Sequence, residues 1–123
     1  MQFSGPLKEN RQFRRLYARG HHSANRYLAM YCRRNGLHLN RVGITVSARL
    51  GKAVRRNRVR RRLREIYRLN EERFRPGQDI VVVARTRAMN ASYRQLEQAY
   101  LTLAGQLNLL REEEAPHGEK TAP

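Results

Sequence analysis

The 123-residue chain has few of the residues on which catalytic and metal sites usually depend. It contains one cysteine, Cys32, one aspartate, Asp79, and no tryptophan. A single cysteine allows no internal disulfide and no cysteine-based zinc site, which indicates a reducing, intracellular setting. No stretch approaches the roughly 20 apolar residues of a membrane-spanning helix, and no secretory signal is visible. We therefore expect a cytoplasmic protein that does not span a membrane.

Acidic residues are also scarce. Asp and Glu number 10 against 26 Lys and Arg, so the formal net charge is +16. Four of the acids lie in residues 111–123, which we predict to be a disordered tail. Residues 1–110 then form a single domain with a net charge of +18. Such a charge repels itself, and a polyanion relieves the repulsion; nucleic acid is the first candidate and an anionic membrane surface the second.

The periodicity of apolar residues predicts six elements. In chain order they are a helix over 8–19, strands over 26–33 and 41–47, a helix over 53–70, a strand over 80–84, and a helix that opens with a capping box at Ser92. Strand 26–33 alternates, so Tyr27 and Tyr31 share one face, while Cys32 lies on the aliphatic face as an inert thiol. The β-branched run 80–84 is typical of a central strand.

These elements predict an α/β (α+β) sandwich. Three main helices would pack on a small mixed sheet of about four strands, and the unit 41–84 is long enough for a parallel βαβ crossover. The general handedness rule makes such a crossover right-handed.

The helix over 53–70 carries the densest chemical signal. Residues 49–68 hold ten basic residues and one acid. Like charges at i, i+4 destabilise a helix by a few tenths of a kcal/mol per pair, and a phosphate backbone would relieve this repulsion through counterion release. A merely basic, solvated face is the alternative interpretation.

Aromatic residues suggest a second site. Phe13 and Tyr17 lie one helical turn apart, and if their helix covers strand 26–33 their rings and those of Tyr27 and Tyr31 line a groove. Three basic residues would border it: Arg11, Arg15 and Arg26. Rings beside guanidinium groups form a stacking platform for single-stranded nucleic acid. Ordinary packing between helix and sheet is the alternative.

No catalytic constellation is recognisable in the sequence. Asp79 leads into the predicted central strand, and no pair of carboxylates is placed for a two-metal nuclease. His21 and His22 are adjacent and therefore point in different directions, and Cys32 has no evident base. We expect the polypeptide alone to catalyse nothing.

The segment Arg56–Glu65, RNRVRRRLRE, resembles the RNR signature of the bacterial ribonuclease P protein component. Residues 42–47, 51–54 and 76–85 are similar to the segments that flank this signature in the family, and the resemblance covers about 7–110. It implies that the crossover is left-handed, an exception to the general rule. Two departures are Tyr17, where Phe is common, and Ala48-Arg49, where many members have two lysines.

The resemblance implies a division of labour. A large RNA subunit would hold the active site and most of the Mg²⁺, and would cleave precursor tRNA at the 5′ end. No metal is assigned to the protein. The protein would bind that RNA and the 5′ leader, without an obligatory protein partner and without a membrane partner. The residues implied for the RNA subunit are Lys52, Arg55, Arg56, Asn57, Arg58, Arg60, Arg61, Arg64 and Arg68. Those implied for the leader are Phe13, Tyr17, Asn25, Arg26 and Tyr31, to which the predicted groove adds Arg11. A general structural RNA-binding protein and a self-sufficient metal-dependent nuclease are the rival hypotheses.

Overall fold

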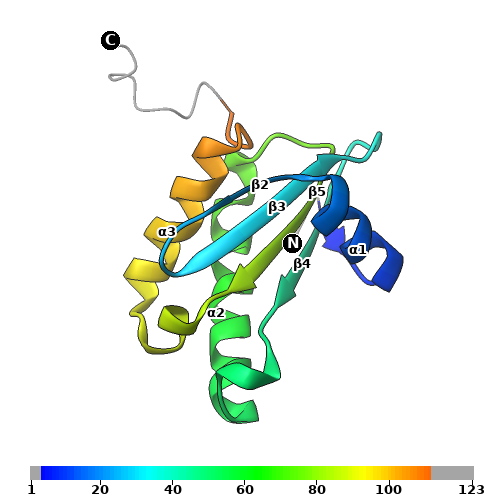
Figure 1. Ribbon diagram of the computed structural model, residues 1–123. Helices are drawn as coiled ribbons and strands as arrows, with labels where there is room; N and C mark the ends of the chain where they lie inside the picture. Colours follow the sequence, from blue (N-terminus) through cyan, green and yellow to red (C-terminus); the bar gives the residue numbers. More distant parts are fainter. Residues whose placement is uncertain (1–3, 112–123) are drawn as a thin grey trace.

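The computed structural model describes residues 4–111 (Figure 1). Its elements are β1 (Ser4–Pro6), α1 (Asn10–Arg19), β2 (His21–Ala24), β3 (Leu28–Arg34), β4 (Asn40–Thr45), α2 (Ala53–Asn70), β5 (Gln78–Ala84) and α3 (Tyr93–Gln106), with short 3₁₀ turns η1 (Ala48–Leu50), η2 (Glu71–Arg73) and η3 (Thr86–Asn90). All six predicted elements are present; α2 has the predicted bounds, and the ends of most others are shifted. Within the described residues no helix is long and apolar enough to cross a membrane.

The sheet has five strands rather than about four, in the order β1-β4-β5-β3-β2. The predicted central strand is confirmed, because β5 lies between parallel β4 and antiparallel β3. Ile80, Val81 and Val82 of β5 are fully buried. The two strands that the sequence did not reveal, β1 and β2, are the edges of the sheet, and neither carries apolar alternation.

The parallel pair β4 and β5 is joined through α2, as the spacing predicts. In Figure 1 both strands point down the page, α2 returns behind the sheet, and the chain moves from β4 on the right to β5 on the left. This arrangement is a left-handed crossover, which the general rule does not predict and the resemblance does.

Each face of the sheet packs against helices. On one face, Leu28, Met30 and Cys32 join the main core with residues of α2 and α3. Burial raises the pKa of the Cys32 thiol, which agrees with the predicted inert cysteine. On the other face, α1 covers Val81 with Leu16, and Leu7 joins this smaller cluster.

Glycine at position 43 sets how closely α1 approaches the sheet. An added Cβ at Gly43 would lie 2.7 Å from the Cζ of Phe13 and 3.2 Å from the Cβ of Leu7. The Phe13 ring therefore rests against the backbone of β4, where no larger residue leaves room for it.

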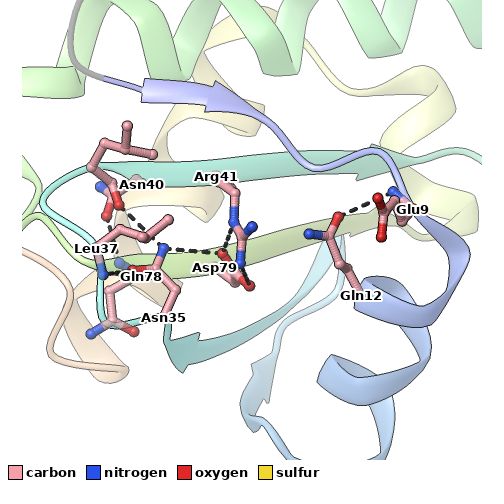
Figure 2. A network of polar contacts seen from close by, with 9 residues as sticks. Glu9, Gln12, Asn35, Leu37, Asn40, Arg41, Gln78 and Asp79 are labelled. Carbon is pink, nitrogen blue, oxygen red and sulfur yellow. Dashed lines mark hydrogen bonds and ion pairs between the residues drawn. The ribbon is translucent and has the colours of Figure 1, made fainter.

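A polar network fixes the end of the sheet at which β5 begins (Figure 2). Arg41 on β4 donates from Nε and Nη2 to the two carboxylate oxygens of Asp79, at 2.7 and 2.9 Å. Asn35 donates to the same carboxylate at 3.1 Å. Asn40 accepts from the Gln78 backbone N–H at 2.8 Å and donates to the Tyr67 hydroxyl at 3.1 Å. The network joins the β3–β4 loop, β5 and α2.

Two buried tyrosines provide a matched test of this packing. The Tyr67 hydroxyl has two partners, Asn40 and Ser4, whereas the Tyr100 hydroxyl is buried with no partner among the described residues. Tyr67→Phe should lower the free energy of unfolding by about 1–2 kcal/mol, because it removes two hydrogen bonds, and Tyr100→Phe should leave it unchanged or raise it. Urea unfolding at fixed salt measures both, and a larger loss in Tyr100→Phe would contradict the assignment.

The same tyrosines predict how stability depends on alkaline pH. Burial raises the pKa of both Tyr67 and Tyr100. An unfolded tyrosine ionises near pH 10, so the stability conferred by the protonated phenols is complete below that pH and is lost as the pH rises above it. Tyr100→Phe should flatten the fall in unfolding free energy above about pH 10, and an unchanged slope would show that Tyr100 does not cause it.

Candidate nucleic-acid interface

The apolar stripe of α2 decides which of its arginines face outward. Val59, Leu63, Ile66 and Tyr67 are buried against the sheet and α3. Basic residues occupy most of the remaining surface of the helix, as the sequence indicated. Their hydrogen bonds divide them into three groups.

Two arginines of α2 anchor the segment that follows β5. The Nη2 of Arg55 donates to the Oδ1 of Asn90 at 2.5 Å and to the Met89 carbonyl at 3.3 Å. The Nη1 of Arg62 donates to the Ala91 carbonyl at 3.2 Å. These side chains therefore have a structural role.

Three others make contacts within or beside α2. The Nε of Arg56 donates to the Gly51 carbonyl at 3.0 Å, which ties the helix start to the preceding turn. Arg60 donates to the Oδ1 of Asn57 at 2.8 Å. Arg68 forms an ion pair with Glu65 at 2.6 Å, and this hydrogen bond lowers the pKa of Glu65.

The third group is free to bind a ligand. Arg58, Arg61 and Arg64 are exposed, follow one another at three-residue spacing, and have no side-chain hydrogen bond or ion pair with any residue between 4 and 111. Lys52, also exposed, precedes the helix as its N-cap residue. Uncompensated charges arranged in this way attract a polyanion.

On the opposite side of the sheet, the exposed rings of Tyr17 and His22 and the half-buried ring of Tyr31 form a cluster, which we call the aromatic face. The Tyr17 and Tyr31 rings meet edge to face with centroids 4.9 Å apart, and the His22 ring stacks on Tyr31 at 5.4 Å. Tyr17 is 42% exposed, and its hydroxyl lies 3.3 Å from the Oγ1 of Thr45. The predicted approach of the first helix to Tyr31 is therefore confirmed.

Sequence reasoning gave His22 no role, although it belongs to the aromatic face. Its position follows from the pairing of β2 with β3, which sets His22 opposite Tyr31. Since β2 has no apolar pattern, the sequence offered only the adjacent histidine pair as a signal.

Phe13 lies deeper than the other predicted rings. It packs beside Leu7, Leu16 and Val81, with its ring against Gly43. Its main visible role is to hold α1 on the sheet. Arg11 is exposed at the start of the same helix and pairs with Glu9 at 2.8 Å, and Arg15 is exposed as well.

The structure corrects the expected positions of Tyr27, Asn25 and Arg26. Strand β3 begins at Leu28, and Tyr27 packs against the main core rather than beside Tyr31. The Oδ1 of Asn25 accepts the backbone N–H groups of Tyr27 and Leu28, and its amide donates to the Ala99 carbonyl of α3. Asn25 and Arg26 therefore line a hollow against α3, not a groove beneath α1.

Three of the six carboxylates within residues 4–111 are paired with arginines. Glu9, Glu65 and Asp79 lie at three separate places, and each pairs with an arginine. Residues 4–111 contain no group of three His, Cys, Asp or Glu side chains that could hold a metal ion.

A basic helix on one side of the sheet and exposed rings on the other define a small nucleic-acid-binding α+β protein. The family model described as Ribonuclease P matches residues 1–108. The chain belongs to this family, that of the ribonuclease P protein component, an RNA-binding subunit that takes part in 5′ maturation of tRNA. The prediction made from the RNR segment is confirmed.

Relatives and solved structures agree. A ribonuclease P protein component of Alkaliphilus oremlandii is 45% identical over 104 residues, which cover 85% of this chain and 91% of that protein. A ribonuclease P protein component from Clostridioides difficile is 43% identical over 98 residues, which cover 79% of this chain and 86% of that protein. The Staphylococcus aureus RNase P protein superposes with a TM-score of 0.80 at 30% identity, covering 89% of this chain and 98% of that one. The RNase P protein from Thermotoga maritima superposes with a TM-score of 0.74 at 32% identity, and the match covers 79% of this chain and 92% of that one.

The grouping of α2 arginines can be tested by charge removal. Arg58→Gln with Arg61→Gln should reduce the slope of log affinity against log salt by about 2 for a bacterial ribonuclease P RNA, because two phosphate contacts are lost. The free energy of unfolding should stay the same or rise by a few tenths of a kcal/mol, because repulsion along the helix falls. Arg62→Gln should instead lower the free energy of unfolding by about 1 kcal/mol through its lost hydrogen bond to Ala91. Filter binding across salt and urea unfolding measure the two effects. The opposite pattern would refute the grouping.

Proposed function

We propose that α2 seats the protein on the ribonuclease P RNA while the aromatic face holds the single-stranded 5′ leader of precursor tRNA. The observation that carries the proposal is the placement of unpartnered arginines and exposed rings on opposite sides of one sheet. Two separated surfaces let one small protein contact two RNA segments at the same time.

The chemistry of the aromatic face suits unpaired nucleotides. Tyr17 and Tyr31 present rings at right angles, and His22 adds a third ring over Tyr31. Bases that are not paired can stack on such rings without regard to sequence, with about 1–3 kcal/mol per base. Bases within a duplex have no free face to offer.

The proposal leaves hydrolysis to the RNA subunit and to Mg²⁺ held mainly by that RNA. It is supported by the pairing of Glu9, Glu65 and Asp79 with arginines, which leaves those carboxylates poorly placed to activate water. In the proposed assembly the protein neutralises phosphates and positions the leader, and the family membership supports its place in an endoribonuclease holoenzyme.

Reconstitution separates this proposal from its two rivals. Purified protein is mixed with a bacterial ribonuclease P RNA and precursor tRNA at low Mg²⁺, where stimulated cleavage at the mature 5′ end is expected. A general structural RNA-binding protein would give no stimulation that depends on precursor tRNA. Cleavage by the protein without added RNA subunit would support a self-sufficient nuclease.

The leader assignment predicts a selective loss. In the reconstituted holoenzyme, Tyr17→Ala should weaken precursor tRNA binding by about 5- to 160-fold, as expected for one lost stacked base, and should leave binding of mature tRNA unchanged. Tyr17→Phe is the matched control, since it keeps the ring and removes only the contact with Thr45. Equal losses for precursor and mature tRNA would remove the leader role.

A further inference from the structure

A basic pocket lies at the end of the sheet opposite the start of α2. It has a volume of about 640 Å³ and is lined by Arg19, His21, Arg33, Arg34 and Arg75, with Cys32 and Gln78 among its other walls. Here β3 ends and β5 begins, whereas α2 starts beyond the far ends of β4 and β5 (Figure 1). We call it the end pocket.

The charge of the end pocket is not compensated. None of its lining residues is acidic. Arg19, Arg33 and Arg34 have no side-chain hydrogen bond or ion pair with the described residues, and Arg75 uses only its Nε, which donates to the Leu110 carbonyl at 3.0 Å. Four guanidinium groups around one hollow repel one another unless an anion enters.

The one carboxylate beside this pocket in the sheet register is already occupied. Asp79 stands opposite Arg33 in the β3–β5 pairing. Both of its oxygens accept from Arg41 on the other neighbouring strand, and Asn35 donates to one of them. Because Arg41 and Asn35 already occupy the Asp79 carboxylate, the guanidinium of Arg33 is available to an external ligand.

The end pocket continues the aromatic face. Arg33 is two residues beyond Tyr31 on β3, about 7 Å along the same face of the strand. Arg19 follows Tyr17 by two residues at the end of α1, and His21 precedes the stacked ring of His22. A strand of RNA whose bases lie on the rings, and which continues along β3 away from the start of α2, passes these arginines.

We propose that the end pocket binds the backbone phosphates of leader nucleotides upstream of those on the aromatic face. Planar guanidinium forks match phosphate oxygens, and the contacts read no base. The proposal rests on the proposed leader role of the aromatic face and extends it: the protein senses leader length as well as the presence of a leader.

The test compares two precursor tRNAs in the reconstituted holoenzyme, with leaders of about 4 and about 12 nucleotides, within the span that single-strand sites cover. Arg33→Gln with Arg34→Gln should weaken the long-leader precursor about tenfold and the short-leader precursor less than twofold. The slope of log affinity against log salt should fall by about 1.4 for the long leader alone, as for two lost single-strand phosphate contacts. Arg34→Gln alone, at an exposed position, gives a smaller shift in the same direction and guards against misfolding of the double variant.

The control removes the same charge elsewhere. Arg87 and Arg94 are exposed and lie outside the end pocket, so Arg87→Gln with Arg94→Gln should affect long and short leaders equally.

Equal losses for both leaders in Arg33→Gln/Arg34→Gln would overturn the proposal, as would a loss of affinity for the RNA subunit without tRNA. If Tyr17→Ala also fails to separate precursor from mature tRNA, the leader role itself fails; if it does separate them, only the end pocket is refuted.

Discussion

Repulsion among the arginines of α2 constrains the rest of the structure, because other contacts must offset it. The helix carries its charges on most of its exposed surface, and only Glu65 opposes them within it. What keeps it helical is tertiary: Val59, Leu63 and Ile66 are buried almost completely in the main core. Burial of each such side chain contributes about 1.5–3 kcal/mol, several times the repulsion of one like-charge pair. The core thus holds the charges in place for a ligand to neutralise.

The sheet separates the basic surface of α2 from the aromatic face, because helices pack on both of its sides. Because β5 is covered on both faces, α2 and α3 occupy one side and α1 the other. The close contact of Phe13 with Gly43 keeps α1 low on the sheet, and the rings of Tyr17 and Tyr31 then meet beside it. A single glycine in β4 therefore influences the geometry of the aromatic face, although it contributes no side chain to it.

The sequence predicts the parts of this arrangement that have local periodicity. The stripe of α2, the capping box at Ser92 and the apolar run of β5 all specify their elements directly, and the structure confirms them. Edge strand β2 is defined only by its pairing with β3, so neither it nor His22 could be placed. Tyr27 was misplaced because Asn25 binds the N–H groups of Tyr27 and Leu28, and this turn delays the start of β3. The end pocket draws on four separate segments and has no sequence pattern.

Charge density along the chain also cannot separate structural arginines from binding ones. Arg55 donates to two acceptors in η3 at once, and Arg41 donates to both carboxylate oxygens of Asp79. Both contacts use several N–H donors of one planar guanidinium group. A lysine ammonium is a compact point charge and cannot offer donors in this planar arrangement. The composition of 23 arginines and three lysines therefore has a structural explanation. The guanidinium geometry that satisfies backbone carbonyls around η3 is also the geometry that suits phosphate oxygens, and Arg58, Arg61 and Arg64 have no partner among residues 4–111, so the chemistry that stabilises the fold is the same one that suits RNA binding.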